Sequence, residues 1–309
     1  MKVLVTGVNG QLGHDVMLQL ARRGHNAIGS GSGERYKGTD DLASMAYQPL
    51  DICDNAAVLQ TLEKLHPDAV IHCSAWTAVD AAEELENRDK VFALNVKGPE
   101  NIAKACRTVE AKMVYVSTDY VFGGEGEAPW KPDCKAFQPL NVYGETKLAG
   151  EFTVSGSLDS CFVVRTAWVF GKNGKNFVKT MLNSAKTHSE VRVVCDQFGT
   201  PTYTQDLARL LVDMIETEKY GYYHATNEGG YISWSDFAEE IFRQAGMDTR
   251  VIPVTTTEYG LSKATRPHNS RLDKSKLREA GFEPLPDWKN ALSRYLKEIQ
   301  ENGTDSSRA

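Results

Sequence analysis

A tyrosine and a lysine in the stretch PLNVYGETKLAGE, residues 139–151, have the types and spacing for acid–base chemistry. Tyr143 and Lys147 are four residues apart among good helix formers, so a helix would place phenol and ammonium on one face, one turn apart. A nearby cation favours the phenolate and lowers the pKa of a tyrosine from its usual value of roughly 10. Such a pair can donate a proton to a developing alkoxide near neutral pH. The same spacing also arises by chance on surface helices, so the hypothesis depends on the elements around the pair.

The N-terminal residues predict a turn that binds a dinucleotide. Lys2–Thr6 is a short apolar strand, residues 7–13 read GVNGQLG, and apolar residues then recur at helical spacing until Gly24. In such a G-x-x-G-x-x-G turn the first glycine makes the bend, the second lets the backbone approach a pyrophosphate, and the third lets the helix pack against the sheet. The helix N-terminus then presents free N–H groups to the phosphates. The alternative is a glycine-rich turn without a ligand, which the flanking strand and helix disfavour.

The residues after the expected second strand, 25–28, bear on which dinucleotide is preferred. A site selective for NAD usually has an acidic residue there, which binds the ribose 2′-hydroxyl. This chain reads GSGSGER at 29–35, so small residues leave room, and Ser30 and Arg35 are candidates to meet a 2′-phosphate. The sequence therefore slightly favours NADPH over NADH, and the alternative is a flexible loop with Arg35 in solvent. Asp51, at the end of the expected third strand, is a candidate to accept from the adenine amine.

Alternating strands and helices predict an α/β fold that brings these residues to one edge of a sheet. Further apolar strands are expected at Ala69–His72, 112–116 and 161–165. Ligands of open parallel sheets collect at the carboxyl ends of the strands, where Thr118 would supply a hydroxyl to act with Tyr143. We therefore predict a Rossmann-type doubly wound parallel sheet.

A second lobe is expected because the alternation of strand and helix becomes less regular after the sixth strand. The NAD(P)-binding Rossmann domain is expected at residues 1–168, with exchanged segments at about 190–225. The smaller α/β C-terminal lobe, for substrate, is expected at about 169–189 and 226–301. Residues 302–309 are expected to form a flexible tail.

Composition narrows the class of protein. The chain has 309 residues and a formal net charge of −6, which gives no electrostatic reason to expect nucleic acid or an anionic membrane as a partner. The start, MKVLVTG, is typical of a strand rather than a secretory signal, and no apolar run approaches the roughly 18–20 residues of a membrane span. The six cysteines are scattered without a C-x-x-C pattern, so a metal site or a disulfide framework is not expected and a reducing cytoplasm fits.

Three signals now occur in order: TGVNGQLG at 6–13, STDYVF at 117–122 and YGETK at 143–147. Together they resemble the extended short-chain dehydrogenase/reductases. The similarity is closer to one branch, the dTDP-4-dehydrorhamnose reductases, in which STDYVF, PLNVYGxTKLAGE, RTxWV(F/Y), NF, DQxGxPT and RPxNSxL recur in this order. Those motifs stand here at 117–122, 139–151, 165–170, 176–177, 196–202 and 266–272. The resemblance covers nearly the whole chain.

The resemblance implies hydride transfer from NADPH or NADH to the C4 ketone of a nucleotide-linked 6-deoxyhexose, dTDP-4-dehydro-L-rhamnose. In that chemistry Tyr143 donates the proton, Lys147 lowers its pKa and holds the nicotinamide ribose, and Thr118 hydrogen-bonds the carbonyl oxygen. The implied cofactor contacts are Gly7, Asn9, Gly10, Gln11, Leu12, Asp51, Ile52, Ser74, Ala75 and Asn95, with a structural role for Asn95 as the alternative. The implied substrate contacts are Thr118, Asp119, Tyr120, Trp168, Asn176 and Arg266. Arg266 suits a diphosphate because of its fixed fork of donors, whereas packing is the alternative for Trp168.

The chain departs from the family in two respects. Members that prefer NADH often carry an acid after the second strand, where this chain has Ser30. Some members form magnesium-dependent dimers through acidic side chains, which raises a homodimer as a candidate state. Only Asp15 matches one of those acidic positions, so we predict no metal.

Two alternative functions stay open from the sequence. A 4-epimerase or 4,6-dehydratase would use the same Tyr/Lys pair, but dehydratases carry Asp-Glu after the active-site threonine, and here Thr118 precedes Asp119 and Tyr120. The second alternative is a non-catalytic, NADP-binding regulatory subunit of methionine adenosyltransferase. Consumption of added NADPH by a sugar substrate distinguishes the reductase from both.

Overall fold

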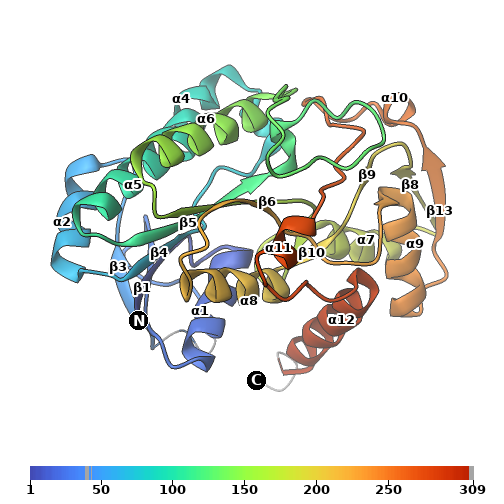
Figure 1. The fold of residues 1–309 in the computed structure, drawn as a ribbon. Coiled ribbons are helices and arrows are strands. Elements are labelled where there is room, and N and C mark those ends of the chain that lie inside the picture. Colours follow the sequence, from blue (N-terminus) through green and yellow to red (C-terminus); the bar gives the residue numbers. More distant parts are fainter. Residues whose placement is uncertain (39–41, 43, 306–309) are drawn as a thin grey trace.

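The computed structural model describes residues 1–38, 42 and 44–305, and its centre is a seven-stranded sheet in which every neighbouring pair is parallel (Figure 1). The strand order is β11-β6-β5-β4-β1-β2-β3, so the chain begins inside the sheet and the order reverses beside β1. In such doubly wound sheets the ligand crevice lies at that reversal, outside the carboxyl ends of the strands. The predicted fold class is confirmed. The strands are β1 (Lys2–Thr6), β2 (Asn26–Gly31), β3 (Ala46–Pro49), β4 (Ala69–His72), β5 (Lys112–Thr118), β6 (Cys161–Thr166) and β11 (Gly221–His224).

Helices cover both faces of the sheet and create two apolar cores. On one face are α1 (Gln11–Arg22) and α8 (Thr204–Ile215); on the other are α2 (Asn55–Leu65), α5 (Gly98–Thr108) and α6 (Val142–Ser157). All four residues of β4 are buried, as expected for a parallel strand covered on both faces.

The smaller lobe lies at one end of the sheet and is made of short strand pairs and helices, drawn mostly in orange and red in Figure 1. Its strand pairs are β7 (Val169–Phe170) with β10 (Thr202–Tyr203), β9 (Phe198–Gly199) with β12 (Ile232–Ser233), and β8 (Glu190–Val194) with β13 (Arg250–Val254). Its helices are α7 (Phe177–Ala185), α9 (Trp234–Ala245), α10 (Thr256–Tyr259), α11 (Ser275–Glu279) and α12 (Trp288–Asp305). A separate aromatic core holds it together, with Phe170, Phe237 and Tyr295 fully buried.

We expected the segments at about 190–225 to belong to the Rossmann domain, and part of that prediction is wrong. β8 pairs with β13 inside the smaller lobe and does not join the large sheet, whereas β11 does join it beside β6. Pairing partners are set by contacts far apart in sequence, which local patterns do not reveal. The exact limits of the two lobes stay a prediction. The expected tail at 302–309 is also shorter than predicted, because α12 continues to Asp305; residues 306–309 lie outside the described part of the chain.

The segment between β4 and β5 consists of several short helical pieces. It contains α3 (Val79–Ala82), a 3-10 turn (Leu85–Asn87), α4 (Arg88–Phe92) and a π-helical turn (Ala93–Lys97) before α5 begins. π-helical turns are frequently found at functional sites. Within the described residues, no helix has the length and apolar character that crossing a membrane would require.

Candidate active site

The predicted acid–base pair lies on α6, which begins where the sequence indicates. Asn141 is the N-cap and accepts from Gly144 N at 2.8 Å. The helix is pressed against the sheet at Gly150, where a Cβ would lie 2.3 Å from both the carbonyl oxygen of Asn95 and the hydroxyl of Tyr115. Glycine is therefore required there, and α6 is held close to β5.

Tyr143 and Thr118 are brought together at the carboxyl end of β5. Thr118 is the last residue of that strand, and its hydroxyl lies close enough to the phenol of Tyr143 to affect the pKa of that phenol. The ring of Tyr120 meets the ring of Tyr143 edge-on, with centroids 5.7 Å apart. The phenol and hydroxyl thus converge, as the sequence predicts.

The expected lowering of the Tyr143 pKa is not found. Burial raises the pKa of this phenol above its ordinary value, the hydroxyl of Thr118 offsets part of that rise, and the charge of Asp119 adds to it. Tyr143 therefore holds its proton at neutral pH, which is the state that a proton donor needs.

The position of Lys147 explains why the pKa of Tyr143 is not lowered. Its Nζ donates to the carbonyl oxygen of Val116 at 2.8 Å and lies 4.1 Å from the ring centroid of Tyr115. Burial lowers the pKa of Lys147 to about 7, and the charge of Glu151 opposes that change. The amine faces the sheet, is only partly charged at neutral pH, and does little to stabilise a phenolate.

Asp119 adds a second titratable group beside Thr118. Its Oδ1 accepts from the Thr118 hydroxyl at 3.0 Å, and burial raises the pKa of the carboxyl group to about 6. Its Oδ2 is buried and has no hydrogen-bond partner among the described residues. A buried oxygen of this kind is suited to accept from a bound hydroxyl group.

The glycine turn has the geometry that a pyrophosphate site requires. Gly7 has a φ of +73°, and a Cβ on Gly13 would lie 2.4 Å from the Gly7 carbonyl oxygen, so α1 packs directly on the turn. Gly10 is the N-cap of α1 and has no side chain to accept from the first-turn N–H groups. Those N–H groups are thus left for an anion, and the residues present fit a dinucleotide.

The other residues predicted to contact the cofactor lie in different environments. β2 continues to Gly31, so Ser30 lies within the strand, where its buried hydroxyl has no partner among the described residues, while Arg35 is exposed beyond the strand. The exposed Asp51 accepts from Cys53 N at 2.9 Å. Most of the remaining residues lie in or next to the turn or at the start of the segment after β4: Asn9, Gln11, Leu12, Ser74 and Ala75. Ile52 lies between β3 and α2 and is buried in an apolar core.

Asn95 has the structural role that the sequence left as an alternative. It lies in the π-helical turn, where its Oδ1 accepts from Trp76 N at 2.8 Å and its Nδ2 donates to the hydroxyl of Thr146 at 3.1 Å. The side chain therefore joins the segment after β4 to the catalytic helix. A contact between Asn95 and the cofactor stays a prediction.

The substrate residues expected in the smaller lobe lie at its boundary with the sheet, but they do not all face open space. Trp168 has a φ of +51° and stacks on Trp234 with ring centroids 3.7 Å apart. Asn176 is the N-cap of α7, accepts from Lys179 N, and donates to Gln11, Gly171 and Tyr295. Its polar atoms are thus used inside the protein, and its contact with a nucleotide stays a prediction.

A cavity of about 280 Å³ opens between the two lobes near these residues. Arg266 lines it, as do Asp80, Arg192 and Trp234. Ligand pockets typically measure about 300–1,000 Å³, so this cavity is small but suited to part of a nucleotide. Of its lining residues, only Arg266 was among our sequence candidates.

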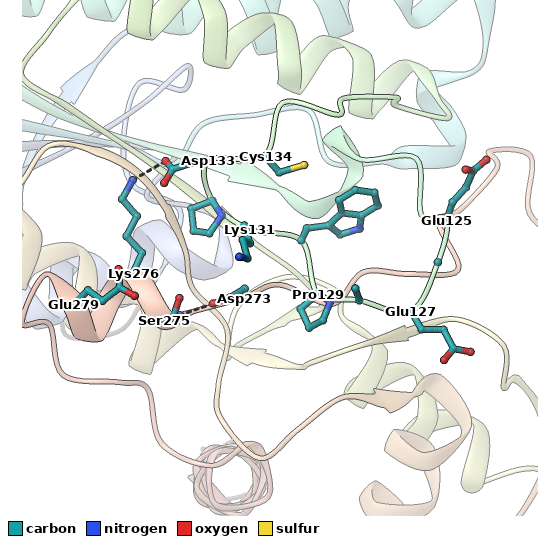
Figure 2. Close-up of a pocket in the computed structure, with 14 residues that line it drawn as sticks. Glu125, Glu127, Pro129, Lys131, Asp133, Cys134, Asp273, Ser275, Lys276 and Glu279 are labelled. Atoms are coloured by element: carbon teal, nitrogen blue, oxygen red, sulfur yellow. Dashed lines mark hydrogen bonds and ion pairs between the residues drawn. The ribbon is translucent and has the colours of Figure 1, made fainter.

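A larger cavity, of about 810 Å³, does not belong to the predicted site. It lies between residues 125–134 and the segment around α11, and Figure 2 shows Lys276 paired there with Asp133. None of the predicted site residues is among those that line it.

Sequence reasoning missed a buried ion pair beneath the site. Glu151 on α6 accepts from Arg165 on β6 through two bonds, Nε to Oε1 at 2.8 Å and Nη2 to Oε2 at 2.7 Å, and it also accepts from Ser117 Oγ at 2.6 Å. The two side chains are 0% and 1% exposed. Both residues fall inside recurring motifs, which was the available signal.

No cluster of three or more metal-ligating side chains occurs in the part of the chain that the structure describes. Asp15, which matched a metal position in the family, is buried and bonded to His14 and Thr204.

The fold and this site define a class: a dinucleotide-binding short-chain dehydrogenase/reductase with an added lobe at the carboxyl edge of its sheet. Residues 1–301 match the family model described as the RmlD substrate binding domain, and the chain belongs to that family.

Relatives and solved structures agree with this placement. A dTDP-4-dehydrorhamnose reductase from Streptomyces griseus is 40% identical over 94% of this chain and 91% of its own length. A solved dTDP-4-dehydrorhamnose reductase from Clostridium acetobutylicum is 40% identical, with a TM-score of 0.87, over 97% of this chain and all of its own. A solved dTDP-4-dehydrorhamnose reductase from Bacillus anthracis, in complex with NADP, is 38% identical with a TM-score of 0.85, over 96% and 99%.

Proposed function

We propose that this chain is an oxidoreductase that reduces the 4-keto group of dTDP-4-dehydro-L-rhamnose to give dTDP-L-rhamnose. The reaction belongs to nucleotide-sugar and polysaccharide biosynthesis. The observation that carries the proposal is that α6 brings Tyr143 to the carboxyl end of β5, where its ring meets that of Tyr120, two residues after Thr118, in a chain that matches the family from residue 1 to residue 301. The relatives that bear the same name support the choice of sugar.

The chain's own residues supply binding and proton transfer. NADPH or NADH supplies the hydride when bound, and the glycine turn at residues 7–13 holds its pyrophosphate. Thr118 donates a hydrogen bond to the C4 oxygen of the sugar as negative charge develops there. Tyr143, which keeps its proton at neutral pH, transfers that proton to the same oxygen.

Lys147 has a proposed role in holding the nicotinamide ribose. To reach that position the amine must leave the carbonyl of Val116, and any charge that it then gains stabilises the Tyr143 phenolate that proton transfer leaves behind. The same proposal keeps Asp119, Tyr120, Trp168, Asn176 and Arg266 as substrate contacts.

The proposal extends to cofactor choice, location and assembly. The absence of an acid at Ser30 and the NADP complex of the Bacillus anthracis relative support NADPH as the preferred donor. All six cysteines are free thiols, which supports a cytoplasmic location. A homodimer is the state that sedimentation or light scattering should test.

A spectrophotometric assay with dTDP-4-dehydrorhamnose tests the function directly. We expect consumption of added NADPH, and of NADH more slowly. Tyr143→Phe should lower turnover by roughly 10²–10⁴-fold, the usual worth of a positioned acid, and leave NADPH binding unchanged. Tyr220→Phe, a tyrosine packed on Phe162 away from β5's end, is the matched control. Near-normal turnover by Tyr143→Phe would exclude Tyr143 as the acid, and stoichiometric capture of a methionine adenosyltransferase without sugar reduction would contradict the enzyme assignment.

A further inference from the structure

Asp80 on α3 holds the segment that leads to Arg266. Its Oδ1 accepts from the backbone N–H groups of Lys263 and Ala264, both at 3.0 Å. The same carboxylate pairs with Arg266 through two bonds, Nη1 to Oδ1 at 3.2 Å and Nη2 to Oδ2 at 2.6 Å. One carboxylate thus fixes both the backbone before Arg266 and the guanidinium itself, across 186 residues of sequence.

Arg266 keeps donors for a ligand while it is held in this way. A guanidinium has five N–H donors. Asp80 takes two of them, and the carbonyl oxygen of Ala264 takes one at 3.3 Å. At least one N–H therefore remains, and the Arg266 side chain is 23% exposed at the cavity between the lobes.

The contacts decide between two roles for Asp80. If Asp80 were a stand-in for phosphate, displaced when substrate enters, its departure would leave the N–H groups of Lys263 and Ala264 without their acceptor, which costs free energy. A carboxylate that captures two backbone N–H groups and a guanidinium together is better suited to stay. Asp80 therefore holds this segment and Arg266 in place, rather than occupying the phosphate site until substrate displaces it.

We infer that Asp80 is a positioning residue for the diphosphate of the nucleotide-sugar substrate: it holds Arg266 in its binding orientation before the substrate arrives. This inference rests on the proposed function, in which Arg266 contacts the diphosphate. Because the guanidinium is already ordered, binding does not have to immobilise a long flexible side chain. Tyr120 lies between this arrangement and the catalytic end, since its ring meets that of Tyr143 and the positive charge of Arg266 acts to lower the pKa of its phenol.

Two substitutions separate the two sets of contacts that Asp80 makes. Asp80→Asn keeps an oxygen for the backbone N–H groups but sets an amide N–H against Arg266, whereas Asp80→Ala removes both contacts. Thymidine diphosphate is the probe, titrated by calorimetry into the full chain. We expect Asp80→Asn to weaken its binding by roughly threefold to tenfold, the worth of ordering one long side chain, and Asp80→Ala to weaken it further. KM for the sugar nucleotide should rise while kcat stays near that of the wild type.

The matched control is Glu84→Gln, which removes an exposed ion pair with Lys263 in the same segment and leaves Asp80 in place. It should bind thymidine diphosphate as the wild type does.

A double-mutant cycle with Arg266→Ala decides the inference. If Asp80 acts through Arg266, then Asp80→Asn has no further effect on diphosphate binding in the Arg266→Ala background. An equal loss in both backgrounds, or tighter binding by Asp80→Asn alone, would overturn the inference. Failure of the wild-type chain to bind thymidine diphosphate would instead refute the proposed function.

Discussion

Two carboxylate–guanidinium pairs in this molecule have the same bidentate geometry but different roles. Glu151 and Arg165 are almost completely buried, whereas Asp80 and Arg266 are 44% and 23% exposed. Every nitrogen of Arg165 has a partner: Nε and Nη2 bond to Glu151, and Nη1 donates to Pro132 O at 3.0 Å. Arg266 keeps a donor at the cavity. An arginine whose side chain is almost completely buried holds structure, and one that is held with a donor exposed at a cavity can bind a ligand.

The buried pair also lies directly under the catalytic residues. Glu151 is four residues after Lys147 on the same face of α6, and Ser117, which donates to Glu151, precedes Thr118 on β5. Three aromatic rings lie about the Arg165 guanidinium: Phe122, Phe137 and Tyr222, at 5.1, 5.3 and 5.0 Å. The pair therefore ties α6 to β5 and β6 at the point where Tyr143 must meet Thr118.

The largest difference between the two pairs should appear when one partner is removed. Arg165→Met leaves Glu151 charged, buried and unpaired, and should reduce the free energy of unfolding by roughly 3–5 kcal/mol, measured in urea. The double variant Glu151→Leu with Arg165→Met should recover much of that loss, because no charge is then stranded. If the single variant loses less than about 1 kcal/mol, burial does not make the Glu151–Arg165 pair more important for stability than the Asp80–Arg266 pair.

A smaller effect should appear in the dependence of stability on pH. Burial lowers the pKa of Lys147 to about 7, against roughly 10.4 in an unfolded chain. Between these values the unfolded chain binds a proton at Lys147 that the folded chain does not, so the free energy of unfolding should rise with pH from about 7 to 10.

Lys147→Met should remove this rise, and the exposed Lys104→Met on α5 should keep it. Denaturation in urea at several pH values gives the slopes. An unchanged slope in Lys147→Met would show that the amine is not held neutral beneath the site.

The smallest effect on stability is expected at the exposed pair. Asp80→Asn should change the free energy of unfolding by no more than about 1 kcal/mol, because exposed ion pairs contribute little in water. Urea denaturation gives the free energy of unfolding of this variant, and the titration with thymidine diphosphate gives its affinity. A large loss of stability with unchanged affinity would reverse the distinction between the pairs.

Local sequence signals predicted the elements that carry the chemistry. Asp54 caps α2 and accepts from Ala56 and Ala57 N–H groups, as its type and place predict. The glycine turn adopts the expected conformation, and the helix with Tyr143 meets the strand end with Thr118. These features depend on residue type, short spacing and the direction of parallel strands, all of which are readable from one chain.

Features that depend on distant partners could not be predicted in the same way. The glycines and serines after residue 28 disfavour a strand, yet β2 continues to Gly31 because β1 and β3 pair with it on both sides. Asp80 and Arg266 meet only after folding, and no spacing connects them. Asn176 is a different case, since an asparagine before a helix is a signal for an N-cap, and we gave more weight to the family motif.

The fit of α6 at Gly150 has a consequence for how steadily the phenol is held. The helix meets Asn95 and Tyr115 through its own main chain, with no room for a methyl group between them. The contact with Asn95 joins main chain to main chain and has no alternative rotamers, so repacking of neighbouring apolar side chains cannot lengthen it. The separation between the helix that carries the proton donor and the π-helical turn at Ala93–Lys97 is consequently set by the shape of the backbone itself.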